Sequence, residues 1–128
     1  MIKNKRSLNQ TILLIFAPLL IIIGVAGMLI PADKSLTSGA IPYDIFHIFF
    51  GVIGIIILLA KTERGAIIFN IGFGLIDLYQ AVASYFNLFP KQFFLWTGVD
   101  DILHIVIGLI LVIVGIYGFT KPNYSNQQ

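Results

Sequence analysis

The chain has 128 residues, of which 58% are hydrophobic and 11% charged, and its mean hydropathy is +0.95. Soluble globular domains carry about 25% charged residues, so this composition excludes an ordinary soluble domain. The net charge of +2 comes without a basic, aromatic-interleaved patch, so we expect no nucleic-acid partner. The sequence contains no cysteine, which excludes disulfides, thiolate metal sites and cysteine nucleophiles. An integral membrane protein is therefore predicted.

Four apolar segments are long enough to cross a bilayer as helices, which takes about 20 residues each. We expect these spans at residues 12–30, 43–60, 66–86 and 99–119. The connections between them carry proline, glycine and charged residues, as turns do. The polar ends, residues 1–10 and 121–128, are expected to be short tails. The prediction is one all-α domain over residues 1–128, a bundle of four transmembrane helices.

The first span also resembles the core of a signal peptide, because Lys3, Lys5 and Arg6 precede it. Signal-peptide cores run about 7–15 residues, whereas this apolar stretch continues to Ile30 with no Ala-x-Ala pattern after it. We therefore expect this segment to remain as a spanning helix.

Basic residues are unevenly shared between the two sides of such a bundle. One side would carry Lys34 and Lys91, and the other Lys3, Lys5, Arg6, Lys61, Arg64 and Lys121. Because cytoplasmic segments are enriched in lysine and arginine, both chain ends should lie in the cytoplasm.

An Asp-x-x-His pair occurs twice, as Asp44 with His47 and, 57 residues later, as Asp101 with His104. Each pair is followed four residues after the histidine by a glycine, Gly51 or Gly108. The offset predicts two helical hairpins related by an internal repeat, the second helix of each carrying the pair. The histidines should then lie at similar depth, and the glycine stripes should bring these two helices together.

The third span carries a polar stripe at helical spacing: Asn70, Gly74, Asp77, Gln80 and Ser84. Asp77 should lie within reach of the two histidines, about one helical turn deeper. Thr97 and Asp100 have the spacing of a helix-capping pair, which removes Asp100 from the candidate functional groups.

Three readings of these groups remain open. Ionisable groups in lipid cost about 2.5–3.5 kcal/mol each, so they serve either helix packing, in a structural or accessory protein, or a site. Two carboxylate-x-x-His helices resemble those of four-helix metal proteins, which gives candidate ligands for zinc, iron or manganese in His47, His104, Asp44, Asp101 and Asp77. A b-type haem between His47 and His104, with glycines leaving room for it, is a second cofactor option.

Proton or ion conduction by an oligomer is the third reading, because intramembrane Asp and His are common relay groups. No Ser-His-Asp set or nucleophile elbow is present, which disfavours an enzyme. The expected partners are the lipid bilayer and either a larger membrane complex or further copies of the chain.

Two stretches, His47-x-x-x-Gly51-Val-Ile-Gly54 and Asp101-Ile-Leu-His104-Ile-Val-Ile-Gly108, make the chain resemble the DUF4383 family. These are small bacterial four-helix membrane proteins grouped under a domain of unknown function. The resemblance covers most of the chain. It implies a small protein of a bacterial inner membrane and supplies no activity.

Overall fold

The computed structural model describes residues 5–121, and all its regular elements over that range are helical. They are α1 (Leu8–Leu29), the 3-10 turn η1 (Ala32–Lys34), α2 (Ile41–Ala60), α3 (Glu63–Phe86), α4 (Lys91–Phe94) and α5 (Gly98–Thr120). Four of them, α1, α2, α3 and α5, are long and apolar enough to cross a membrane. The predicted all-α bundle of four transmembrane helices is confirmed, and the two short helical turns η1 and α4 were not expected.

Helices α1 and α5 each begin with a capping box. In α1 the Ser7 hydroxyl accepts a hydrogen bond from the Gln10 amide at 3.1 Å, and the Gln10 side chain accepts one from the Ser7 amide at 2.9 Å. This cap starts the helix at Leu8, so the prediction that residues 1–10 form a tail is wrong for Leu8 to Gln10. The cap of α5, formed by Thr97 and Asp100, was predicted and is confirmed.

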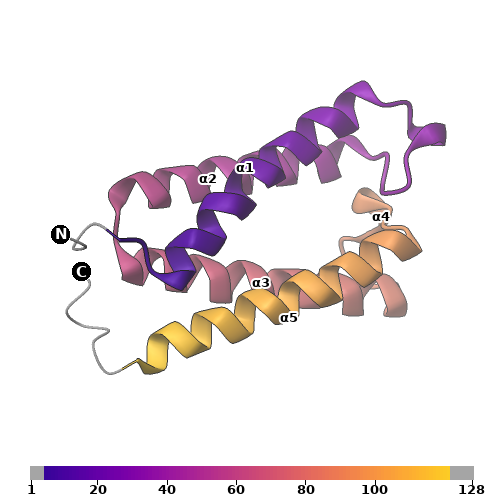
Figure 1. The fold of residues 1–128 in the computed structure, drawn as a ribbon. Helices are drawn as coiled ribbons and strands as arrows, with labels where there is room; N and C mark the ends of the chain where they lie inside the picture. The colour runs from indigo at the N-terminus through magenta and orange to yellow at the C-terminus, as the bar shows by residue number, and fades with distance from the viewer. Residues whose placement is uncertain (1–4, 122–128) are drawn as a thin grey trace.

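The spanning helices pair as two antiparallel hairpins, α1 with α2 and α3 with α5 (Figure 1). Glycines make this close pairing possible. A Cβ on Gly51 would lie 2.9 Å from the Ala17 carbonyl oxygen, and one on Gly108 would lie 2.9 Å from the Gly74 carbonyl oxygen. The prediction that Gly51 and Gly108 join α2 to α5 is therefore wrong. Each glycine faces the antiparallel partner within its own hairpin, where the backbones approach most closely.

The two hairpins use contacts at equivalent positions. The α1 residues nearest Gly51 are Ala17 and Ile21, and the α3 residues nearest Gly108 are Gly74 and Leu78. Gly74 lies 57 positions after Ala17, and Leu78 lies 57 positions after Ile21. The Asp-x-x-His pairs are separated by the same 57 residues. The sequence offset thus corresponds to a shared packing geometry.

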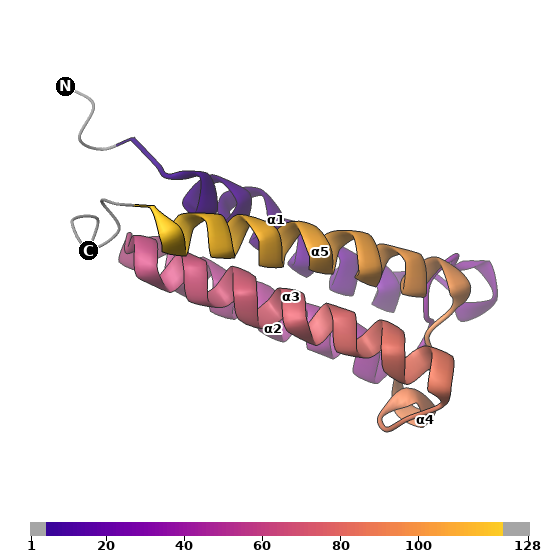
Figure 2. The ribbon, with the colours of Figure 1, turned by 90° about the horizontal axis from the view of Figure 1, so that it is seen from below.

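Viewed from below, α1 and α5 form one side of the bundle, and α2 and α3 form the other (Figure 2). An apolar core fills the space between the hairpins, with the parallel Phe69 and Phe73 rings at a centroid distance of 5.6 Å. Its buried members are Leu13, Phe16, Ala17, Leu20, Ala66, Phe69, Phe73 and Leu111. This core lies between two polar regions near the ends of the bundle.

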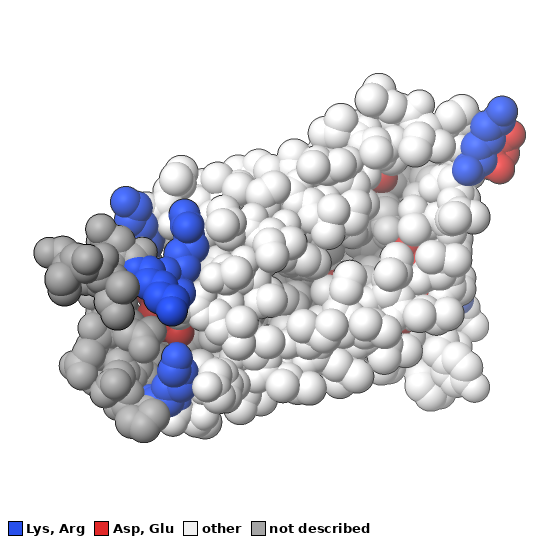
Figure 3. All heavy atoms as spheres, viewed as in Figure 1, with Lys and Arg blue, Asp and Glu red and all other residues white. Residues whose placement is uncertain are grey.

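We name the two ends of the bundle by what lies there. At the long-loop end lie the α1–α2 connection (residues 30–40) and the α3–α5 connection (residues 87–97); at the terminal end, α1 begins and α5 ends (Figure 1). On the face shown in Figure 3, lysine and arginine side chains gather at the ends, and the surface between them is mostly uncharged. This distribution suits a molecule whose middle lies in lipid.

Candidate functional site

Both Asp-x-x-His pairs lie at the long-loop end, because α2 and α5 run in the same direction from that end (Figure 1). His47 and His104 are 7% and 5% exposed, so both rings face the interior. Both histidines are therefore interior and at the same end of the bundle, as expected, whereas a meeting of the two rings stays a prediction.

The surroundings of the two histidines differ. His47 bonds through Nδ1 to the Tyr43 carbonyl oxygen at 2.7 Å, and its ring lies 4.3 Å from the Tyr43 ring. His104 packs edge-on against Trp96, with centroids 6.2 Å apart. Its buried Nδ1 has no hydrogen-bond partner among residues 5–121. The doubled pair in the sequence therefore gives two buried histidines whose surroundings are not equivalent.

The carboxylates expected to join the histidines are spread over different surroundings. Asp44 is buried, and its carboxylate lies against Gly27 of α1, where a Cβ would come within 2.0 Å of Asp44 Oδ1. Asp77 is buried on α3, whereas Asp101 is half-buried on α5. Within the described part of the chain, no three or more His, Cys, Asp or Glu side chains form a group that could hold a metal ion. The metal hypothesis has no support from this arrangement, because the hairpin packing places Asp44 against α1.

The haem hypothesis relied on glycines that leave room for the macrocycle between α2 and α5. That room is filled. Ile21 Cγ1 lies 2.5 Å from the Cβ position of Gly51, and Leu78 Cγ lies 2.9 Å from that of Gly108. The glycines accommodate neighbouring helices, so they give no argument for a haem.

The carboxylate that joins the two hairpins is Asp100, which is 1% exposed. Its Oδ1 accepts the Tyr43 hydroxyl at 2.6 Å, and its Oδ2 accepts the Ser38 backbone amide at 2.8 Å. Both donors belong to the N-terminal half, and the Thr97 amide donates to the same Oδ2 at 2.8 Å as part of the cap. The predicted cap is therefore only part of the role of Asp100, because capping leaves oxygen lone pairs free for other donors. We call Ser38, Tyr43 and Asp100 the long-loop clamp.

Two further hydrogen bonds join the loops beside this clamp. The Ser38 hydroxyl donates to the Phe94 carbonyl oxygen, and the Thr97 hydroxyl donates to the Leu36 carbonyl oxygen at 3.1 Å. The α1–α2 connection is thus bonded to the segment that precedes α5. A sequence signal for the clamp existed: Tyr43 and Asp100 are themselves 57 residues apart, directly before the repeated acids.

A second group of buried polar residues lies at the terminal end. Asn9 of α1, 1% exposed, donates to the Val114 carbonyl oxygen of α5 at 3.1 Å and accepts from Asn70 of α3 at 2.9 Å. The Ser7 hydroxyl donates to buried Glu63, the first residue of α3. We call Ser7, Asn9, Glu63 and Asn70 the terminal clamp. Sequence reasoning missed it because Asn9 was assigned to a tail, although the Ser7-x-x-Gln10 spacing signals a helix start there.

The polar stripe of α3 is buried as predicted, from Asn70 through Asp77 and Gln80 to Ser84. Asn70 belongs to the terminal clamp, whereas Gln80 lies toward the long-loop end. Neither side-chain polar atom of Gln80 has a hydrogen-bond partner within residues 5–121. Gly74 packs against Gly108 in the antiparallel pair of α3 and α5. Because a helix rises about 1.5 Å per residue, Asp77 and His104 lie within about one helical turn of each other along the bundle axis.

The fold and these contacts define an all-α integral membrane bundle of four spanning helices, with polar clamps at both ends of its interior. Comparisons with protein-family models, with curated proteins and with solved structures find no match for this chain.

Proposed function

We propose that this chain is a structural or accessory component of a bacterial inner membrane, and that its buried polar groups hold two helical hairpins in a fixed arrangement. One observation carries the proposal. The Asp100 carboxylate caps its own helix and also accepts hydrogen bonds from Ser38 and Tyr43 of the other hairpin. A buried carboxylate with three donors in place serves packing directly.

The terminal clamp supports the same function. Asn9 bridges α3 and α5 from α1, which joins the hairpins at the end opposite to Asp100. Direct contacts between the hairpins are much less extensive than those within each hairpin. Because lipid supplies little hydrophobic driving force for helix association, buried hydrogen bonds at two distant points can fix the relative position of the hairpins.

Conduction of protons or ions is less well supported by this geometry. The two clamps lie on opposite sides of the apolar core, in which the Phe16 and Phe69 rings pack against Phe73. Neither a hydrated ion nor a chain of waters is stable against such a surface without polar partners. An oligomer would have to open a separate path.

The surroundings of the bundle follow from charge and exposed apolar surface. We propose that the terminal end faces the cytoplasm, because most basic residues are assigned to it. The outward faces of the spanning helices expose large apolar side chains, which suit lipid and a neighbouring membrane subunit or second copy of the chain. We further propose that the two hairpins are a tandem repeat, which the equivalent glycine contacts support. Membership of the DUF4383 family is also part of the proposal.

Reconstituted protein provides the test. Full-length protein in liposomes that contain a pH-sensitive dye should leak protons no faster than protein-free liposomes under an imposed gradient. Elemental analysis and an absorption spectrum of the purified protein should show neither stoichiometric metal nor a haem band. Proton flux that disappears in Asp77→Asn, or a bound metal or haem lost in His104→Ala, would overturn the structural role.

A further inference from the structure

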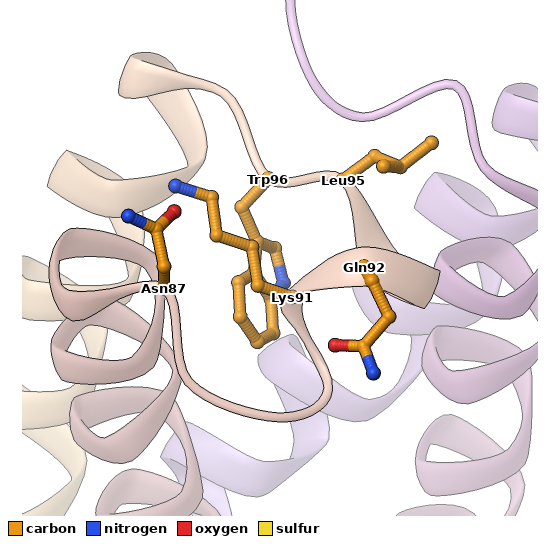
Figure 4. A pocket seen from close by; sticks show the side chains of 5 residues that line it. All are labelled: Asn87, Lys91, Gln92, Leu95 and Trp96. Carbon is orange, nitrogen blue, oxygen red and sulfur yellow. The ribbon is translucent and has the colours of Figure 1, made fainter.

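A pocket with a volume of about 420 Å³ lies at the long-loop end (Figure 4), and none of the Asp-x-x-His residues lines it. Its lining comes from the end of α3, from α4 and from the segment before α5: Asn87, Lys91, Gln92, Leu95 and Trp96. In Figure 4 the Trp96 ring lies between Asn87 and Gln92, and the Lys91 side chain crosses it with its nitrogen toward Asn87. We propose that this pocket binds the phosphate group of an anionic membrane phospholipid.

The polar lining matches an anion that accepts hydrogen bonds. Lys91 supplies a positive charge, no acidic residue is among the lining residues, and Asn87 and Gln92 add amide donors. The Lys91 ammonium donates to the Ser84 carbonyl oxygen, which uses one of its three N–H groups. Two donors remain for phosphate oxygens, and bonds between ionised groups are the stronger kind.

The structural role of Lys91 does not account for the whole pocket. Its bond to Ser84 satisfies a carbonyl in the last turn of α3, where a cation also complements the helix dipole. This bond holds the Lys91 side chain in place, but it does not explain why Asn87 and Gln92 in the lining of the pocket are also polar. The side chains of Asn87 and Gln92 are exposed and belong to neither clamp, so their amides are available to a ligand.

The apolar surroundings identify the phosphate as part of a lipid. Trp96 is buried in the pocket wall, and the neighbouring large side chains Leu88, Phe89, Phe93 and Leu95 are all exposed. The pocket lies at the end of a spanning helix, at the level where tryptophan and lysine are common in membrane proteins. A headgroup phosphate bound there would leave its acyl chains along exposed apolar surface, whereas free phosphate would gain nothing from that surface.

Charge also selects among phospholipids. A phosphatidylethanolamine or phosphatidylcholine headgroup carries a cation beside its phosphate, and the pocket offers Lys91 and no carboxylate to meet it. Phosphatidylglycerol has the same phosphate without that cation. The pocket should therefore prefer phosphatidylglycerol.

Native mass spectrometry of the full-length protein in mild detergent tests this preference. With equal amounts of each lipid added, the wild type should retain phosphatidylglycerol about fivefold to tenfold better than phosphatidylcholine, because only phosphatidylcholine brings a second cation toward Lys91. Lys91→Gln should lower retention of phosphatidylglycerol to the level of phosphatidylcholine. Lys34→Gln is the matched control, because Lys34 is an exposed lysine of η1 at the same end and does not line the pocket. It should leave retention unchanged.

A second variant separates lipid binding from folding. Gln92→Glu changes an exposed side chain that makes no clamp contact, and it places a negative charge in the pocket. It should reduce retention of phosphatidylglycerol while the unfolding temperature stays that of the wild type. Equal retention by the wild type, Lys91→Gln and Gln92→Glu, or equal binding of both lipids, would overturn the proposal. Displacement of phosphatidylglycerol by millimolar inorganic phosphate would assign the pocket to free phosphate and also refute it.

Discussion

The Tyr43 hydroxyl donates a hydrogen bond of 2.6 Å to the Asp100 carboxylate across the two hairpins. The two residues lie 57 positions apart, directly before Asp44 and Asp101. Because α2 and α5 run in the same direction from the long-loop end, Tyr43 and Asp100 lie near the start of their helices at the same end of the bundle (Figure 1). At this contact α2 supplies the donor and α5 the acceptor, so it needs a different residue on each helix.

Replacing Tyr43 with Phe removes this donor and keeps the ring. We expect a loss of about 1–2 kcal/mol in the free energy of unfolding, because a hydrogen bond to a buried charged group is lost. The measurement is unfolding of the protein in detergent with increasing dodecyl sulfate, followed by circular dichroism. Tyr79→Phe is the control: Tyr79 is 48% exposed and its hydroxyl donates to the Phe89 carbonyl oxygen at 2.7 Å. It should change stability by less than about 0.5 kcal/mol. Equal losses in both variants would contradict the clamp.

Asp100 and Asp101 are adjacent acids with different surroundings, so their Asn variants form a matched pair. In Asp100→Asn an amide NH2 replaces an oxygen that accepts hydrogen bonds from surrounding donors. Because that bond is lost and a donor faces other donors, we expect the free energy of unfolding to fall by about 2–3 kcal/mol. Asp101 is half-buried, and its Oδ1 has no partner within residues 5–121. Asp101→Asn should therefore leave stability unchanged or raise it, since a neutral amide is less costly in lipid. The same unfolding measurement compares the two variants. A larger loss of stability in Asp101→Asn than in Asp100→Asn would contradict the assignment of Asp100 as the carboxylate that joins the hairpins.

Asn9→Ala tests the terminal clamp. The variant leaves the Asn70 amide without its 2.9 Å acceptor and removes the donor to Val114, so we expect a loss of about 1–2 kcal/mol. Thr11→Ala, two residues along α1 and exposed, should have little effect. A cysteine pair between α1 and α5 near this end, monitored by spin-label distances, should also report a wider spread in Asn9→Ala. An unchanged distance distribution together with unchanged stability would show that Asn9 does not hold the hairpins.

Glycine variants test the packing within the hairpins. Gly108→Ala would place a Cβ 2.9 Å from the Gly74 carbonyl oxygen, which forces α3 and α5 apart, and we expect a loss of about 1–3 kcal/mol. Gly51→Ala should act similarly on α1 and α2, because the Ala17 carbonyl oxygen lies at the same distance. Gly72→Ala has no atom within 4 Å of the new Cβ and should be neutral or stabilising, since alanine favours helix. Thermal unfolding in one detergent compares all three, and destabilisation by Gly72→Ala as large as by Gly108→Ala would refute the packing argument.

The spans and the buried faces were predictable because their signals are local. Hydropathy over about 20 residues identifies a spanning helix, and helical spacing identifies which side chains share a face. The α3 stripe containing Asp77 and Gln80, and the interior placement of His47 and His104, followed from these rules. The start of α1 was misplaced because hydropathy ignores a polar first turn, although the Ser7–Gln10 cap was readable.

The sequence by itself determined four transmembrane helices, the polar face of α3 and the doubled Asp-x-x-His pair, because periodicity and hydropathy act over one or two helical turns. The tertiary structure alone decided that Gly51 and Gly108 serve contacts within hairpins, and that Asp100 receives donors from the other half. Those outcomes depend on which helix faces meet and on the path of the loop carrying Ser38. Partners far apart in the chain are set by packing of the whole bundle, which no local pattern records.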